Sequence, residues 1–119
     1  MSKLGQTLDD LLAEIGRTLL IWGWLEGEMI AAKIDWRHTA PDAAPEPLRT
    51  FLTDLAEPRL IRNAIAHGLA SCHSDPWAPE FEPYVTCRTR DAELRTITLG
   101  NLRQTQVQIE RLRNLLRAI

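Results

Sequence analysis

The first third of the chain carries an apolar stripe that only a long helix can align. Leucine, isoleucine, tryptophan and methionine recur at steps of three and four from Leu4 to Met29, which is the period of one face of an α-helix. The spacing predicts a helix from about residue 3 to about residue 34. Further apolar residues lie off this stripe, so one helical layer cannot cover the middle of the helix. These residues are Leu12, Leu20, Ile21, Trp24 and Ile30.

A glycine between two tryptophans marks the centre of this segment. Gly23 lowers helix propensity but removes a side chain where another backbone could approach Trp22 and Trp24. Two ordinary core tryptophans would explain the pattern, and a self-association surface would explain it as well. We favour self-association, because the polar motif described next also needs a partner.

A second helical segment ends in a polar motif. It follows a proline-rich connection at residues 37–47 and begins near Leu48. Pro58 either kinks it or occupies the first turn of a new helix. In either case residues 59–67 are helical, so the motif is carried on a rigid element.

The motif, residues 62–68, reads Arg-Asn-Ala-Ile-Ala-His-Gly. Arg62 can hold a phosphate through a planar fork of donors, and His67 is suited to moving a proton near neutral pH. Asn63 is four residues from His67 and can orient the imidazole. Gly68 is expected to end the helix in the left-handed conformation, which places His67 where the helix dipole favours the protonated ring. The combination indicates phosphodiester chemistry.

At these residues the chain resembles the HEPN superfamily of small all-helical domains. The hallmark of that family is an Arg followed after four to six residues by a His, often with a polar residue directly after the Arg. Arg62, Asn63 and His67 match it, and the order of predicted helices matches over most of the chain. The resemblance implies one HEPN-like domain over residues 1–119, a mainly α antiparallel helical bundle. A length of 119 residues suits one domain.

The resemblance also implies a function. HEPN proteins are typically metal-independent endoribonucleases that need no cofactor and cleave RNA at the cleft of a homodimer. Arg62, Asn63 and His67 would then be catalytic. The implied setting is a toxin or defence module, with a nucleotidyltransferase-type antitoxin as a partner. Some members lack activity, so the alternative is a non-catalytic binding or assembly protein whose motif bridges subunits. A net charge of −2 favours that alternative, because it gives no global attraction to RNA.

The rest of the chain departs from the family. A loop with three prolines and the aromatic residues Trp77 and Phe81 follows the motif. Residues 84–88 and 94–98 favour strands and predict a hairpin that must dock on the helices. A last helix of about 19 residues follows. On the polar face of this helix Glu110 interrupts a row of arginines, which is more typical of a solvated face than of an RNA-binding one. The arginines are Arg103, Arg111, Arg113 and Arg117.

Other candidate sites are weaker. Cys72, His73 and Cys87, with His38 or His67, could be imagined as zinc ligands, but there is no Cys-x-x-Cys pair. We therefore expect no metal site and reduced thiols. No Gly-rich phosphate loop is present.

Two further expectations concern charged residues of the first helix. Glu26 and Glu28 could orient Arg62 or His67, although exposed helix carboxylates are the more ordinary explanation. Acidic residues interrupt the N-terminal region before any continuous apolar run, and the longest such run is too short to cross a bilayer. The expected location is cytoplasmic, with no membrane partner.

Overall fold

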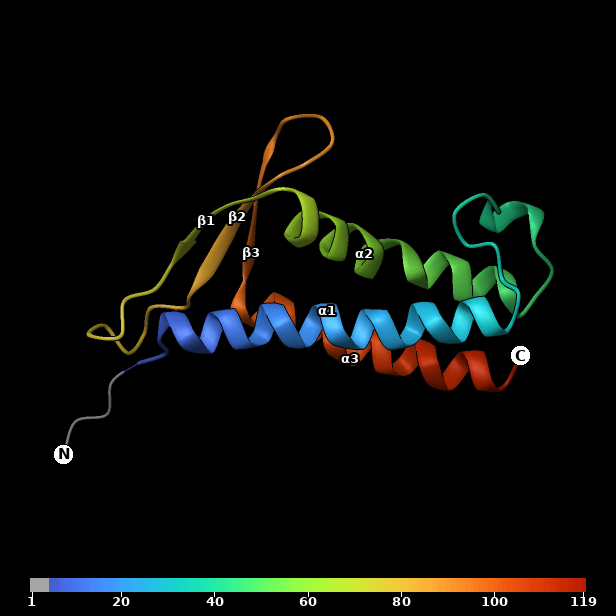
Figure 1. Cartoon of the computed structure of the whole chain (residues 1–119), viewed down its shortest axis with the longest axis horizontal. Helices are drawn as coiled ribbons and strands as arrows, with labels where there is room; N and C mark the ends of the chain where they lie inside the picture. The colour runs from blue at the N-terminus through green and yellow to red at the C-terminus, as the bar shows by residue number, and fades with distance from the viewer. Residues whose placement is uncertain (1–4) are drawn as a thin grey trace.

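Three helices and a three-stranded antiparallel sheet make up the chain, which is therefore mainly α (Figure 1). The computed structural model describes residues 5–119. The elements in order are α1 (Leu8–Ala31), the 3₁₀ turn η1 (Pro41–Ala43), α2 (Leu48–His67), β1 (Leu69–His73), β2 (Tyr84–Arg88), β3 (Leu94–Thr98) and α3 (Leu99–Arg117). The sheet stands at the end of the molecule where α1 begins and α2 ends (Figure 1).

The bounds of α1 are narrower than the predicted 3–34, and local chemistry explains both ends. The Thr7 hydroxyl accepts a hydrogen bond from the Asp10 amide, and the Asp10 carboxylate accepts one from the Thr7 amide. This reciprocal cap starts the helix at Leu8. Lys33 adopts a left-handed φ of 59° and ends the helix early. Residues 3 and 4 lie outside the described part.

The second helix runs without a break through Pro58, which is buried. It ends at His67 as expected, but Gly68 has a φ of −122°, so the predicted left-handed cap is wrong. The glycine is needed for a different reason. A side chain at Gly68 would overlap the carbonyl oxygen of Arg88, and the Arg88 amide donates to the Gly68 carbonyl at 2.7 Å. Strand β2 therefore stops α2 by close backbone approach.

The predicted hairpin is present as β2 and β3, but the sequence analysis missed β1. The sheet has the order β1-β2-β3, so β2 is central. Tyr84 pairs with Thr98 on one side and with His73 on the other. The segment 69–73 reads Leu-Ala-Ser-Cys-His and has little strand propensity of its own. It is a strand because β2 supplies the hydrogen-bonding edge.

The apolar core forms two clusters. One lies between the three helices and includes Trp22, Leu25 and Phe51. The other joins α1 and α2 to the sheet and includes Ile15, Ile61 and the fully buried Val85, Cys87, Ile97, Leu99 and Leu102. The motif helix packs on the first helix here, because Ile61 and Ile65 lie in this second cluster with Leu11 and Ile15.

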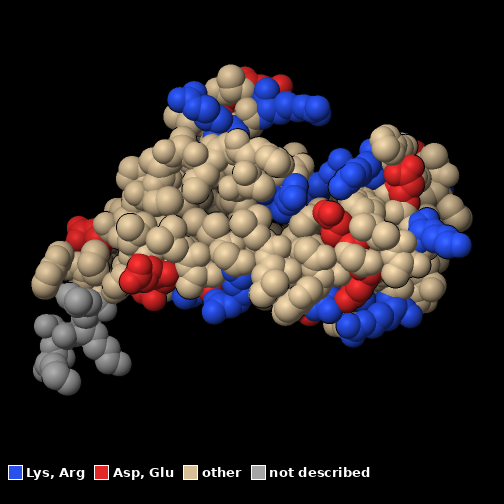
Figure 2. Space-filling view, viewed as in Figure 1, with Lys and Arg blue, Asp and Glu red and all other residues tan. Residues whose placement is uncertain are grey.

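One side of α1 has apolar residues and no covering element within residues 5–119. Leu12, Leu20, Trp24 and Ile30 are 46, 54, 49 and 61% exposed, whereas Trp22 is buried. Gly16, Gly23 and Gly27 also face open space. Figure 2 shows a broad face without charge over this part of the molecule, with charged groups toward its ends. We call these seven residues the bare face of α1.

No helix within residues 5–119 has the length and apolar character that crossing a membrane would need.

Candidate functional site

The three predicted site residues lie in the last two turns of α2. Arg62 and Asn63 are half-buried, and His67 is exposed at the end of the helix. Ala64 and Ile65, between them in sequence, are buried in the helix–sheet core. The apolar residues of this segment therefore fix the helix, and the polar residues project from it. None of the three is buried.

Hydrogen bonding within the motif differs from the expected pattern. The Arg62 Nη1 donates to the Asn63 Oδ1 at 3.0 Å. No hydrogen bond joins Asn63 to His67 within the described chain, so Asn63 holds the guanidinium rather than the imidazole. Arg62 retains other N–H groups that can donate to an anion. The site therefore offers a positioned cation and an exposed imidazole that lie about 140° apart around one helix.

A further cation lies beside the motif that sequence reasoning did not identify. Arg88, at the end of β2, is exposed and joins the backbone of Gly68 directly after His67. Its position depends on the pairing of β2 with the segment that follows α2. No local signal in the sequence indicates that pairing, because the two segments are separated by the proline-containing loop.

The acidic residues of α1 do not approach the motif, so the suggested role for Glu26 and Glu28 is wrong. Glu26 accepts a hydrogen bond from Trp22 Nε1 at 2.9 Å and lies 3.7 Å from Arg37. Glu28 accepts from Arg113 at 2.6 Å. Both carboxylates are used within the helical bundle.

The basic face of α3 is largely occupied by carboxylates. Arg103 pairs with Glu14 of α1 at 3.0 Å. Arg113 pairs with Glu28, and this hydrogen bond raises the pKa of its guanidinium above the ordinary value. Arg117 lies 3.9 Å from Glu28. These pairs join α3 to α1, which supports the expectation that this face is not an RNA surface.

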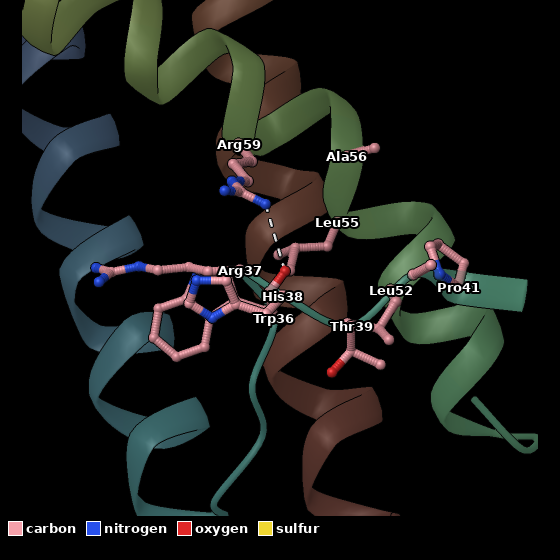
Figure 3. A pocket seen from close by; sticks show the side chains of 10 residues that line it. Trp36, Arg37, His38, Thr39, Pro41, Leu52, Leu55, Ala56 and Arg59 are labelled. Carbon is pink, nitrogen blue, oxygen red and sulfur yellow. Dashed lines mark hydrogen bonds between the residues drawn. The ribbon is translucent and has the colours of Figure 1, made fainter. Parts of the chain in front are cut away.

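The side of α2 that carries Arg62 also borders a hollow of about 370 Å³. Leu52, Leu55, Arg59 and Arg62 follow at steps of three and four, so they lie along one side of the helix. Figure 3 shows Arg59 reaching from α2 toward the segment after α1, which supplies the opposite wall. That segment contributes Trp36, Arg37, His38, Thr39, Ala40 and Pro41. Sequence reasoning treated most of it as a surface connection.

The cysteines lie in the sheet. Both are free, with Cys87 buried and Cys72 half-buried. Burial raises the pKa of the Cys87 thiol, and the neighbouring Cys72 raises it further. His73 stacks on Tyr84 at 4.6 Å. Within residues 5–119 no three His, Cys, Asp or Glu side chains come together as a metal site would require.

Comparisons with family models, curated proteins and solved structures found no match.

Proposed function

We propose that the chain is a HEPN-like bundle that acts as a metal-independent endoribonuclease. The observation that carries this proposal is the placement of Arg62, Asn63 and His67 on the last two turns of one continuous helix, with the imidazole exposed. A guanidinium and an imidazole at such a position suit cleavage of a phosphodiester. The resemblance to HEPN proteins supports the same chemistry.

The proposed reaction uses the RNA's own 2′-hydroxyl. His67 of one copy removes the hydroxyl proton, and the 2′-oxygen forms a bond to the adjacent phosphorus. The bond from phosphorus to the 5′-oxygen breaks, and His67 of a second copy donates a proton to that leaving oxygen. The products are a 2′,3′-cyclic phosphate and a free 5′-hydroxyl. Arg62 stabilises the charge that develops on the phosphate oxygens, and Asn63 holds Arg62 in place.

A homodimer would supply the second imidazole, and the bare face of α1 supports one. Glycines that meet nothing within 4 Å allow a second helix to approach closely. In an antiparallel pair of α1 helices, the large Leu20 of one copy can lie opposite the small Gly23 of the other. Centred between Ile21 and Trp22, that register pairs Leu20 with Gly23 and Gly16 with Gly27, and it places Leu12 within one position of Ile30.

Charge at the ends of α1 favours the same register. Asp9 and Asp10 begin the helix and are exposed, and Lys33 is exposed just beyond its end. An antiparallel pair places the carboxylates of each copy near Lys33 of the other. Because α2 packs on a different side of α1, both motif helices then lie on the same side of the dimer.

The proposed biological setting follows from the resemblance. A small RNA-cleaving domain of this kind acts as a toxin or defence module and needs a partner that restrains it. We propose an antitoxin of the nucleotidyltransferase type. Copurification with such a protein, with loss of RNA cleavage in the complex, would support this setting.

Cleavage of mixed single-stranded RNA in excess chelator tests the activity. We expect His67→Ala to lower the rate by about 10²–10⁴-fold and Arg62→Ala by about 10²–10³-fold. Arg111→Ala, an exposed arginine on α3, is the matched control and should cleave like the wild type. Products should carry cyclic phosphate ends. Equal rates in all four proteins would rule out this active site.

The alternative is a non-catalytic assembly protein of the same fold. The net charge of −2 favours it, because the chain as a whole does not attract RNA. In that case the Arg62 and His67 variants would weaken self-association, and no protein in the series would cleave RNA. Measuring mass in solution beside cleavage distinguishes the two functions.

A further inference from the structure

The hollow beside Arg59 combines an apolar floor with a cationic rim. Leu52, Leu55 and Ala56 of α2 form one wall, and the first two are buried. Arg59 contributes a guanidinium from α2, whereas the guanidinium of Arg37, another lining residue, points away from Arg59 toward α1 (Figure 3). A nucleotide has the complementary composition, since it carries a flat base and an anionic phosphate.

Arg59 is positioned but not neutralised by an acid. Its Nη1 donates to the Trp36 carbonyl at 3.3 Å, and no carboxylate within residues 5–119 lies in ion-pair distance of it. The long hydrogen bond orients the side chain across the hollow. The remaining N–H groups of a guanidinium can donate to phosphate oxygens.

Arg37 is a second cation near the hollow, although its guanidinium points away from it. Its guanidinium lies 5.1 Å from the centre of the Trp36 ring, and its side chain is 60% exposed. Glu26 lies 3.7 Å away and offsets part of its charge. His38, also on the rim, hydrogen-bonds to Asp35 at 3.0 Å. Glu26 and Asp35 therefore offset the charge of Arg37 and His38. Arg59 is the cation beside the hollow that has no carboxylate partner within residues 5–119.

We propose that this hollow binds a nucleotide of single-stranded RNA next to the one that is cleaved. The base lies over the leucine floor, and its phosphate is held by Arg59. This inference rests on the proposed nuclease function and adds binding residues outside the motif.

The geometry of α2 connects the hollow to the motif. Arg59 and Arg62 are three residues apart on one side of the helix, which places their Cβ atoms about 5–6 Å apart. A strand that contacts Arg62 at the cleaved phosphate can therefore reach Arg59 without crossing the helix. The path follows the side of α2 on which Leu52 and Leu55 also lie.

Binding to a 2′-O-methylated RNA tests the proposal independently of catalysis. Such RNA lacks the attacking hydroxyl, so it stays intact whichever residues cleave. Fluorescence anisotropy of a labelled mixed-sequence oligonucleotide should show at least about tenfold weaker binding for Arg59→Ala, because a hydrogen bond between charged groups is lost. The dependence of affinity on salt should fall by about one counterion. Arg111→Ala is the control for lost charge.

Two more variants sharpen the test. Arg59→Lys keeps the charge without the planar fork and should bind between the wild type and Arg59→Ala; it also serves if the alanine variant fails to fold. Glu26→Gln should strengthen binding, because it frees Arg37. Unchanged affinity and salt dependence in an Arg37→Ala and Arg59→Ala double variant would overturn the proposal. Loss of binding there, with cleavage unaffected by His67→Ala, would retain the hollow and reject the nuclease site.

Discussion

The two sides of α1 differ in how their apolar residues are covered. On the side toward α3, apolar residues such as Leu25 are fully buried, and the carboxylates of Glu14 and Glu28 pair with arginines of α3. On the bare face, four large apolar residues are 46–61% exposed, and three glycines meet nothing within 4 Å. Both sides belong to the same helix, so helix propensity cannot explain why one side is buried and the other is exposed.

The contrast separates folding from association. Burial against α3 stabilises the single chain. A glycine that meets nothing within 4 Å lowers helix stability, and no close contact within the chain compensates for that loss. Arg113 links the two sides, since its guanidinium binds Glu28 and also lies 5.3 Å from the Trp24 ring. We therefore expect substitutions on the covered side to lower the free energy of unfolding, and those on the bare face to change self-association.

The largest expected effect is on the covered side. Leu25→Ala leaves a cavity in the three-helix core and should lower the free energy of unfolding by about 2–5 kcal/mol. Leu20→Ala removes a similar side chain that is 54% exposed, and it should cost much less in the monomer. Denaturant unfolding at low protein concentration measures both. Equal losses would show that the two sides are energetically alike.

Glu28→Gln tests the ion pair that closes the covered side. Glu28 Oε1 accepts two hydrogen bonds from Arg113, whose side chain is only 17% exposed. Weakening these bonds should cost about 1.5–3 kcal/mol of unfolding free energy. Glu110→Gln removes the second carboxylate of Arg113, which is 48% exposed, and should cost under about 1 kcal/mol. A larger loss for Glu110→Gln would show that Glu110, rather than Glu28, is the main partner of Arg113.

How much of this could be read from the sequence depends on whether a feature is local. The repeat from Leu4 to Met29 and the strand-favouring runs at 84–88 and 94–98 predicted α1 and the hairpin, because each pattern lies within one segment. Strand β1 and the steric need for Gly68 depend on β2, which is distant in the chain. The partners of the α3 arginines likewise required the packing of α3 on α1. The motif residues were identifiable, but the hollow beside Arg59 was not.

Leu20→Glu tests the bare face directly. A carboxylate at the centre of an antiparallel α1 pair would be buried beside its own copy, so the dimer should dissociate at least about tenfold more readily, or about 1.4 kcal/mol. The monomer should fold as before, because the position is exposed. Sedimentation across a concentration series measures the mass. An unchanged dimer would place the self-association surface elsewhere, and a wild type that stays monomeric would remove it altogether.

Gly23→Ala has the smallest expected effect and distinguishes most sharply between a solvated face and a helix-packing face. In the single chain, a methyl group at Gly23 meets nothing within 4 Å, so alanine should raise helix stability by about 0.5–1 kcal/mol. In the proposed dimer the same methyl group faces Leu20 of the second copy and holds the two helices apart. The variant should therefore unfold at higher denaturant as a monomer yet associate more weakly. A solvated face would give only the first effect, and a covered glycine would lower the stability of the monomer itself.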